Sequence, residues 1–263
     1  LFCDPEGRMG KKFRPRSPEN ILKEIKILYN QYNIREICFY DDTFTVDRER
    51  IVQLCKELIK RNLDLIWECR TRVDCVDGEL LKLMAQAGCY RIRFGVEAGN
   101  EKILKVLRKG ITKEQARNAF RWSKKYGIET FAYFMLGSPE EDKITMKESI
   151  DFALELNVDY ALFSPTLVFN KGSDLFKWAV SQGCIDPDYW NRFVRGEDLD
   201  PYPVLETPQL DRQTKLNYSR KAYRRFYLRP SFIFKKILDI KDPRKITKYS
   251  LIFFQIILRK FEG

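Results

Sequence analysis

Five strand-like segments alternate with helix-like segments between residues 18 and 182, and this alternation limits the fold more than any other feature of the chain. The predicted strands occupy residues 36–40, 65–70, 90–97, 130–136 and 160–164. Apolar residues recur between them at helical spacing, as in the stripes Ile21, Ile25, Leu28, Tyr29 and Ile51, Cys55, Leu58, Ile59. Asn20 is the expected N-cap of the first helix, and Thr112 with Gln115 predicts a capping box. Strands joined in series by helices predict a parallel sheet with helices outside.

Two of these strands carry charge on one face, which decides between a flat sheet and a barrel. Charged and apolar residues alternate, so that Glu68, Arg70, Arg72, Arg91, Arg93 and Glu97 fall opposite Trp67, Cys69, Thr71, Ile92, Phe94 and Val96. A flat parallel sheet covered by helices on both sides would bury these charges at a large free-energy cost. A barrel-like sheet turns them toward a ligand-holding interior. We therefore expect an α/β fold whose sheet is a partial barrel.

Polar residues follow every predicted strand, at the end where parallel α/β barrels place their active sites. The segments are 41–43 (Asp-Asp-Thr), 70–72 (Arg-Thr-Arg), 97–100 (Glu-Ala-Gly-Asn), 137–141 (Gly-Ser-Pro-Glu-Glu) and 164–166 (Ser-Pro-Thr). Each one alone is equally well explained as a polar loop whose Asp or Asn caps a helix. Five in series, together with the charged strand faces, indicate a shared polar ligand.

The chain contains no histidine, which excludes the Ser-His and Cys-His nucleophile pairs and every zinc site built on imidazole. Its chemistry must come from carboxylates, Arg, Lys, Tyr or a cofactor. The seven cysteines include no Cys-x-x-Cys pair, and several lie in apolar runs such as 36–40. Apart from Cys3, we interpret them as buried thiols in a reducing, cytoplasmic compartment.

Several short motifs resemble those of radical S-adenosylmethionine enzymes. Phe2 and Cys3 resemble the end of Cys-x-x-x-Cys-x-aromatic-Cys, in which three cysteines bind a 4Fe-4S cluster in that superfamily. The resemblance places Asp41 and Asp42 after the second strand of the family fold, where the methionine amino group is contacted. It places Glu97 at the fourth-strand position associated with the ribose and the methionine end. Cys3 is thus the expected metal ligand, and the other residues are expected to bind the cofactor.

Residues 133–140 are similar to the fifth-strand segment Gly-x-Ile-x-Gly-x-x-Glu of the same superfamily, and Gly137 is its second glycine. Tyr133 and Met135 replace the first Gly and the Ile, so the match is partial. We expect Gly137 to lie beside the cofactor. The arginines of the charged strand faces are expected either to pair with Glu68 and Glu97 or to bind carboxylates of the cofactor or of an acidic substrate, and we assign Arg72 to the cofactor.

Residues 4–16, 41–44 and 67–72 look like the cobalamin-associated branch of the superfamily, which includes the anaerobic magnesium-protoporphyrin IX monomethyl ester cyclase-like proteins. This resemblance implies a partial (β/α)6 TIM-like barrel whose first strand, two cluster cysteines and cobalamin-binding domain precede residue 1. Residues 1–182 would form the barrel, truncated at its N-terminus, and residues 183–263 a mostly helical extension. We expect the chain as given to hold no cluster by itself and to be inactive.

The resemblance implies reductive cleavage of S-adenosylmethionine at the cluster to a 5′-deoxyadenosyl radical. The radical would methylate, cyclise or rearrange an unreactive carbon of a small organic substrate, either lipid-soluble or tetrapyrrole-like. The expected cofactors are the 4Fe-4S cluster, S-adenosylmethionine and, through the preceding domain, cobalamin, and a reductant protein is an expected partner. Two alternatives stay open: methylthiolation or methylation of RNA or protein, and a non-catalytic binding module that uses the basic tail.

The net charge of +11 belongs entirely to the C-terminal segment. Residues 211–263 contain 15 Lys and Arg against 4 Asp and Glu, whereas residues 1–210 contain 33 of each. Aromatic residues interleave with Arg and Lys over 218–230, and the apolar run 250–258 is too short to span a bilayer. Three interpretations follow in order of preference: a helical cap packed on the barrel, a membrane-surface helix that makes peripheral contact, and a nucleic-acid patch.

Overall fold

The structure is a computed structural model of the 263-residue chain, in which residues 1–2, 10 and 12–238 are described. One sheet contains five strands in chain order: β1 (Glu36–Phe39), β2 (Ile66–Thr71), β3 (Cys89–Glu97), β4 (Glu129–Leu136) and β5 (Tyr160–Pro165). Every neighbouring pair is parallel. The predicted parallel α/β fold is confirmed, and the strand bounds differ from the sequence prediction by no more than one residue.

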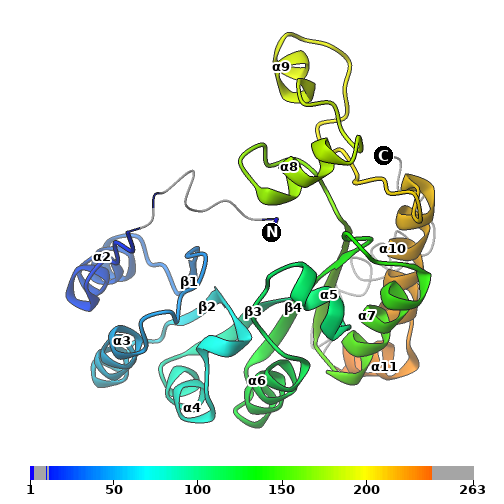
Figure 1. Ribbon diagram of the computed structural model, residues 1–263. Helices are drawn as coiled ribbons and strands as arrows, with labels where there is room; N and C mark the ends of the chain where they lie inside the picture. The colour runs from blue at the N-terminus through cyan, green and yellow to red at the C-terminus, as the bar shows by residue number, and fades with distance from the viewer. Residues whose placement is uncertain (3–9, 11, 239–263) are drawn as a thin grey trace.

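The sheet is curved, and its covering helices lie on the outer side (Figure 1). These helices are α2 (Pro18–Gln31), α3 (Arg48–Arg61), α4 (Gly78–Gln86), α6 (Lys113–Lys125) and α7 (Lys143–Glu155). The chain start at Leu1 lies on the open side of the curve beside α8 (Asp174–Ser181), and α9 (Tyr189–Val194) lies beyond α8 (Figure 1). The short elements η1 (Val73–Cys75) and α5 (Glu101–Val106) follow β2 and β3. This arrangement is a partial barrel, as predicted.

The two faces of the sheet differ because the side chains of a strand alternate between them. Trp67, Cys69, Ile92 and Phe94 face the helices and have no exposed surface. The Trp67 indole also donates to the carbonyl of Ala87 at 2.7 Å. The charged residues of β2 and β3 occupy the inner face, as the sequence pattern predicted.

Three details of the sequence prediction are wrong. Ser17, not Asn20, caps α2, because its hydroxyl accepts from the backbone N–H of Asn20 at 3.2 Å and Pro18 starts the helix. Ile59 is 39% exposed, because it lies at the edge of the apolar stripe of α3. Three cysteines are not buried: Cys75 and Cys184 are partly exposed, and Cys38 is exposed, since β1 presents it on the inner face beside Glu68. The capping box of Thr112 and Gln115 is confirmed.

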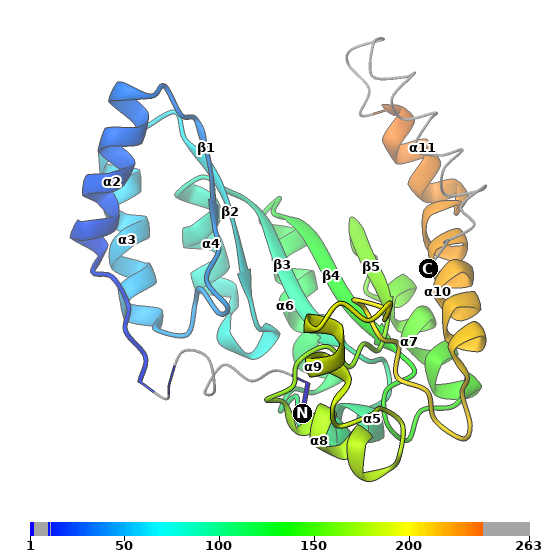
Figure 2. The same cartoon turned by 90° about the horizontal axis from the view of Figure 1, so that it is seen from above.

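Helix α10 (Arg212–Tyr227) packs along β5, and α11 (Pro230–Leu238) follows it (Figure 2). The hydroxyl of Tyr227 accepts from the N–H of Ala161 at 3.0 Å and donates to its carbonyl at 2.7 Å. One turn earlier, the Tyr223 hydroxyl accepts from the N–H of Phe163 at 3.4 Å, and two turns earlier the Ser219 hydroxyl donates to the carbonyl of Phe163 at 2.6 Å. Side-chain hydroxyls of a helix thus form hydrogen bonds with the outward N–H and C=O groups of the last strand.

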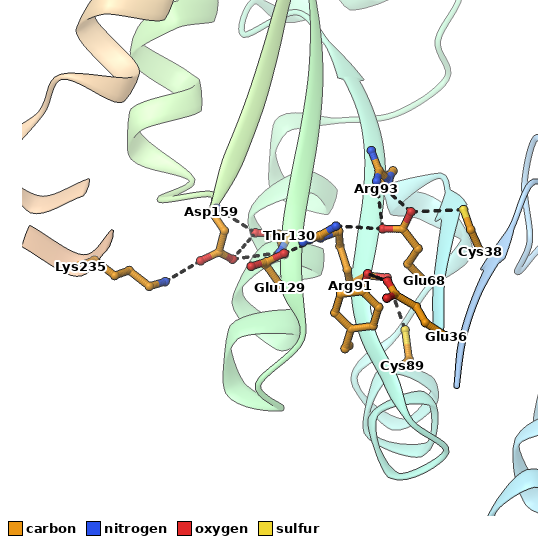
Figure 3. A network of polar contacts seen from close by, with 11 residues as sticks. Glu36, Cys38, Glu68, Cys89, Arg91, Arg93, Glu129, Thr130, Asp159 and Lys235 are labelled. Atoms are coloured by element: carbon orange, nitrogen blue, oxygen red, sulfur yellow. Dashed lines mark hydrogen bonds and ion pairs between the residues drawn. The ribbon is translucent and has the colours of Figure 1, made fainter. Parts of the chain in front are cut away.

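These contacts show that α10 packs as a helical cap on the barrel, the first of the three interpretations of the tail. Phe226 and Ala222 of α10 have no exposed surface. Lys235 of α11 reaches back to Asp159, with 2.6 Å between Nζ and Oδ1 (Figure 3). The apolar run 250–258 lies outside the described residues. Within the described part of the chain, no helix combines the length and apolarity needed to cross a membrane.

Candidate active site at the carboxyl ends of the strands

An ion pair between Glu97 and Lys109 marks the carboxyl end of β3. The two side chains are 2.8 Å apart at Oε1 and Nζ, and Glu97 is buried. The register with β4 shifts between Gly95 and Glu97, and Glu97 takes the left-handed backbone conformation with φ of 71°. Such a conformation costs a non-glycine residue roughly 1–3 kcal/mol and is concentrated at functional sites. A Cβ at Gly95 would lie 2.5 Å from Oε1 of Glu97, so Gly95 makes room for the pair.

Lys109 brings three of the predicted cofactor residues together. Its Nζ lies 5.8 Å from the ring centroid of Phe2, and its carbonyl accepts from Nη2 of Arg72 at 2.8 Å. With Glu97 on the same ammonium group, Phe2, Arg72 and Glu97 surround one lysine. Cys3, the predicted metal ligand, follows Phe2 in the sequence and lies outside the described residues. Lys109 could not be recognised from the sequence, because a lone lysine in a polar loop carries no motif.

Asp41 and Asp42 lie at the same end of the sheet, directly after β1. Oδ1 of Asp41 is 3.7 Å from Nη2 of Arg50, a buried guanidinium whose Nη1 donates to the carbonyl of Arg16 at 3.2 Å. Asp41 also lines a pocket of about 430 Å³ between β1 and α2. Asp42 is exposed. Both carboxylates are therefore accessible to a ligand, and their convergence with Glu97 on one cofactor stays a prediction.

Gly137, after β4, holds a lysine of the C-terminal extension. Gly137 has φ of 80°, and a Cβ there would lie 2.4 Å from Cδ of Lys215. Lys215 has no exposed surface, and its ammonium donates to the carbonyl of Gly137 at 2.6 Å and to that of Leu205. Burial lowers the pKa of Lys215 to about 8. Lys215 could not be recognised from the sequence, because its partners Gly137 and Leu205 are 78 and 10 residues away in the chain.

The loop after β4 also buries an acid. The Glu141 side chain accepts from the backbone N–H of Ser138 at 2.7 Å, and Ser138 shares a hydrogen bond with the Thr166 hydroxyl at 3.0 Å. No partner of Oε1 of Glu141 is found among the described residues. Burial raises the pKa of Glu141 to about 7. This loop joins the ends of β4 and β5 through buried polar contacts.

Glu141→Gln should flatten the pH dependence of stability. The pKa of Glu141 is raised from 4.5 to about 7, so the folded protein holds a proton in this window that the unfolded chain releases. Stability therefore falls as pH rises from about 4.5 to 7. Urea denaturation at pH 5 and pH 7.5 should show that the wild type loses about 1–3 kcal/mol more than the variant. If the wild type and Glu141→Gln lost the same stability between pH 5 and pH 7.5, the raised pKa of Glu141 would be contradicted. Lys215, with its pKa near 8, titrates above this range.

Glu68 organises the inner face of the sheet further from the strand ends (Figure 3). It accepts from Nη2 of Arg93 at 2.8 Å, from Nη1 of Arg91 at 3.2 Å and from Sγ of Cys38 at 3.2 Å. Burial opposes ionisation of Glu68, but the hydrogen bonds from Arg93 and Cys38 outweigh it and lower its pKa. Arg91 also pairs with Glu129. The predicted structural pairing of Arg91 and Arg93 with Glu68 is confirmed, whereas Glu97 pairs with a lysine.

The described residues differ in how well they fit the two groups that the sequence suggests. No group of three or more Cys, Asp or Glu side chains among them is placed to hold a metal ion, so a cluster would depend on Cys3 and on ligands outside the described residues. The strand ends do fit a zwitterion such as S-adenosylmethionine. They offer the carboxylates of Asp41 and Asp42 to an ammonium group, and Nη1 of Arg72, whose Nε and Nη2 are bonded to Asp74, to a carboxylate.

A curved parallel sheet with helices outside, and with acids, arginines and lysines at the carboxyl ends of its strands, defines the class of barrel enzymes that bind a polar ligand at that end. Within this class, the chain matches the family model of the radical SAM superfamily over residues 1–153. The chain therefore belongs to the radical SAM superfamily. The fold and the family resemblance inferred from the sequence are confirmed.

Two curated relatives match nearly the whole chain. An uncharacterised methyltransferase of Pyrococcus horikoshii is 32% identical over 239 residues, which are 91% of this chain and 51% of the relative. The anaerobic magnesium-protoporphyrin IX monomethyl ester cyclase of Rubrivivax gelatinosus is 28% identical over 253 residues, which are 93% of this chain and 43% of the relative. The chain thus spans about half the length of these relatives or less.

Solved structures share the fold. The cobalamin-dependent S-adenosylmethionine radical enzyme OxsB, with aqua-cobalamin bound, superposes with a TM-score of 0.61 at 20% identity, over 97% of this chain and 43% of that one. The radical S-adenosylmethionine methyltransferase TsrM of Kitasatospora setae, with cobalamin and a 4Fe-4S cluster bound, superposes with a TM-score of 0.60 at 21% identity, over 78% and 41%. At these identities the similarity establishes the fold of the chain.

Proposed function

We propose that this chain is the catalytic barrel of a radical SAM enzyme that functionalises an unreactive carbon of a small organic substrate. One observation carries the proposal: Phe2, Arg72 and Glu97 gather around Lys109 at the carboxyl ends of the strands. Phe2 directly precedes Cys3, the predicted cluster ligand, in the sequence. Membership of the superfamily, and relatives named as a methyltransferase and a cyclase, support chemistry at carbon.

A 4Fe-4S cluster with S-adenosylmethionine supplies the reactive radical in this superfamily when both are bound. This chain's own residues would bind and orient S-adenosylmethionine. Glu97, fixed by Lys109, offers its carboxylate to a ligand hydroxyl or ammonium. Nε and Nη2 of Arg72 are bonded to Asp74, so Nη1 is the group that Arg72 would offer to a carboxylate of the cofactor. The space beside the Cα of Gly137 is filled by Lys215, whose ammonium also donates to the Gly137 carbonyl, so contact of Gly137 with the cofactor stays a prediction.

The finer assignments are part of the same proposal. Cobalamin would bind to residues outside this chain, and a reductant protein would supply the electron. A lipid-soluble or tetrapyrrole-like substrate, and peripheral membrane contact through residues 250–258, stay predictions. Binding of RNA through the basic tail has less support, because the hydroxyls of Tyr223 and Tyr227 are engaged by β5.

Glu97→Gln should slow cleavage of S-adenosylmethionine. Anaerobic reconstitution of the full-length protein with iron and sulfide, followed by reduction, is expected to give 5′-deoxyadenosine from S-adenosylmethionine. Loss of the charge that pairs with Lys109 should lower this rate at least about tenfold with unchanged iron content, the size expected for a misplaced binding group. Chromatography of the nucleoside products measures the rate.

Glu79→Gln is the matched control for this experiment. Its side chain is 94% exposed on the outer helix α4, so its rate should equal that of the wild type. A wild-type rate in Glu97→Gln would remove Glu97 from the site. A protein that holds four irons per chain and releases no 5′-deoxyadenosine would overturn the proposed function.

A further inference from the structure

A row of aromatic and cationic side chains crosses the inner face of the sheet at one level. Arg70 of β2 is in register with Arg93 of β3, Arg93 with Phe131 of β4, and Phe131 with Tyr160 of β5. Tyr40, directly after β1, completes the row, because the Arg70 guanidinium lies 3.8 Å from its ring centroid. Two cations are therefore flanked by aromatic rings on the face that the outer helices leave free.

The cations of this row exceed the acids bonded to them. Glu68 is shared by Arg93 and by Arg91, the next cation along β3 on the same face, and Arg91 also pairs with Glu129, so three arginines have two acids. No ion pair joins Arg70 to a carboxylate within the described residues, and its neighbours at this level are Tyr40 and Arg93. In the same part of the chain, Nε of Arg70 and Nε of Arg93 are buried without a hydrogen-bond partner. A half-buried guanidinium without an anion is unfavourable, so the site is built for an anion from outside the sheet.

The other half of the row is aromatic. The rings of Phe131 and Tyr160 are stacked at 6.3 Å with an interplanar angle of 23°, and Tyr133 lies 4.9 Å from Phe131 between ring centroids. All three are half-buried rather than covered. The Arg93 guanidinium lies 5.1 Å from the Phe131 ring, so the cationic and aromatic halves meet there. A ligand seated across the row would place a charged end and an apolar body side by side.

We propose that the inner face binds the substrate as an organic acid. Its carboxylate or phosphate would bind Arg70, with Arg93 beside it, and its flat or apolar body would lie against Phe131 and Tyr160. Arg70 is then a specificity-determining residue that selects acids over neutral analogues. This inference deepens the proposed function by naming the substrate class and rests on it for the reaction that follows binding.

S-adenosylmethionine also has a carboxylate, so the anion at the arginines could come from the substrate or from the cofactor. The positions of Arg70 and Arg72 along the chain distinguish these two ligands. Arg72 follows the last residue of β2 and donates to the carbonyl of Lys109, beside the Glu97–Lys109 pair. Arg70 lies deeper in the sheet, in the row with Phe131 and Tyr160. We therefore assign Arg72 to the cofactor and Arg70 to the substrate.

Calorimetric titration of the full-length protein tests this assignment with three probes: 2-naphthoate, neutral 2-naphthamide and S-adenosylmethionine. The wild type should bind 2-naphthoate at least about tenfold more tightly than 2-naphthamide. Arg70→Met should weaken 2-naphthoate about 10- to 100-fold, as expected for loss of a charge-assisted hydrogen bond, and leave S-adenosylmethionine unchanged. Arg70→Lys should recover part of the loss. Arg121→Met, on the exposed outer face of α6, is the control and should match the wild type.

Each other outcome overturns the inference. If Arg70→Met weakens S-adenosylmethionine and not 2-naphthoate, the anion belongs to the cofactor. If the wild type binds acid and amide equally, or if Arg70→Met folds normally and binds 2-naphthoate like the wild type, the row does not select acids. Because these titrations need no turnover, they stand apart from 5′-deoxyadenosine release, which tests the proposed function.

Discussion

Glu68→Ala is expected to lower the free energy of unfolding by about 2–4 kcal/mol. Glu68 is 7% exposed and is bonded to two guanidinium groups and a thiol. Its removal leaves Arg93 without its carboxylate and Arg91 with Glu129 alone. Breaking a fully buried pair costs roughly 3–5 kcal/mol, and the partial exposure of both arginines reduces that figure.

Urea denaturation at pH 7 measures this loss. Glu68→Gln keeps an acceptor without the charge and should lose about half as much. Glu79→Ala, on the solvated face of α4, should stay within about 0.5 kcal/mol of the wild type. If the free energy of unfolding of Glu68→Ala equalled that of Glu79→Ala, solvation alone would compensate for the lost carboxylate. Arg91 and Arg93 would then not need Glu68 for stability.

Deletion of residues 211–263 is expected to leave no soluble monomer. The deletion uncovers the backbone of Ala161 and Phe163 along β5 and removes Phe226, which packs 5.8 Å from the Phe163 ring. An uncovered strand edge beside exposed aromatic rings is a template for aggregation. Gel filtration of the soluble fraction, and pelleting of the rest, measure the outcome.

The double variant Tyr223→Phe, Tyr227→Phe separates the hydroxyls from the rings. It keeps the aromatic packing and should stay soluble, with a loss of about 1–3 kcal/mol for the unsatisfied groups of β5. A soluble, folded deletion protein would contradict the role of α10 as a cap and would favour a partner outside the barrel for the tail.

The sheet could be predicted because its sequence signal is local. Trp67 and Cys69 fall opposite Glu68 and Arg70 along one strand, and this alternation alone fixes which side faces the helices. Cys38 was assigned wrongly because β1 is four residues long, too short for its alternation to outweigh an apolar run. In a strand this short, the sequence pattern does not show which side chains face the helices.

The polar partners could be predicted only in part. The ion pairs of Glu68 with Arg91 and Arg93 follow from adjacent positions on neighbouring strands, and they were one of the two alternatives predicted for these arginines. The pairing of Glu97 with Lys109 depends on a local bulge and on the space beside Gly95, and the bond of Lys215 to Gly137 spans 78 residues. Neither contact leaves a periodic trace in the sequence.

The hydroxyls that bond to β5 also explain how a helix can satisfy the edge of a sheet in place of a further strand. Tyr223 and Tyr227 are four residues apart, which is about 6 Å along a helix axis. The residues whose backbone groups they meet, Phe163 and Ala161, are two residues apart on β5, which is about 6.6 Å along a parallel strand. These two helical turns therefore follow the outward groups of the strand in step, whereas Ser219, one turn before Tyr223, meets Phe163 again through its carbonyl. A few such turns suffice before the mismatch accumulates, so this form of sheet termination suits short strands and would fail on long ones.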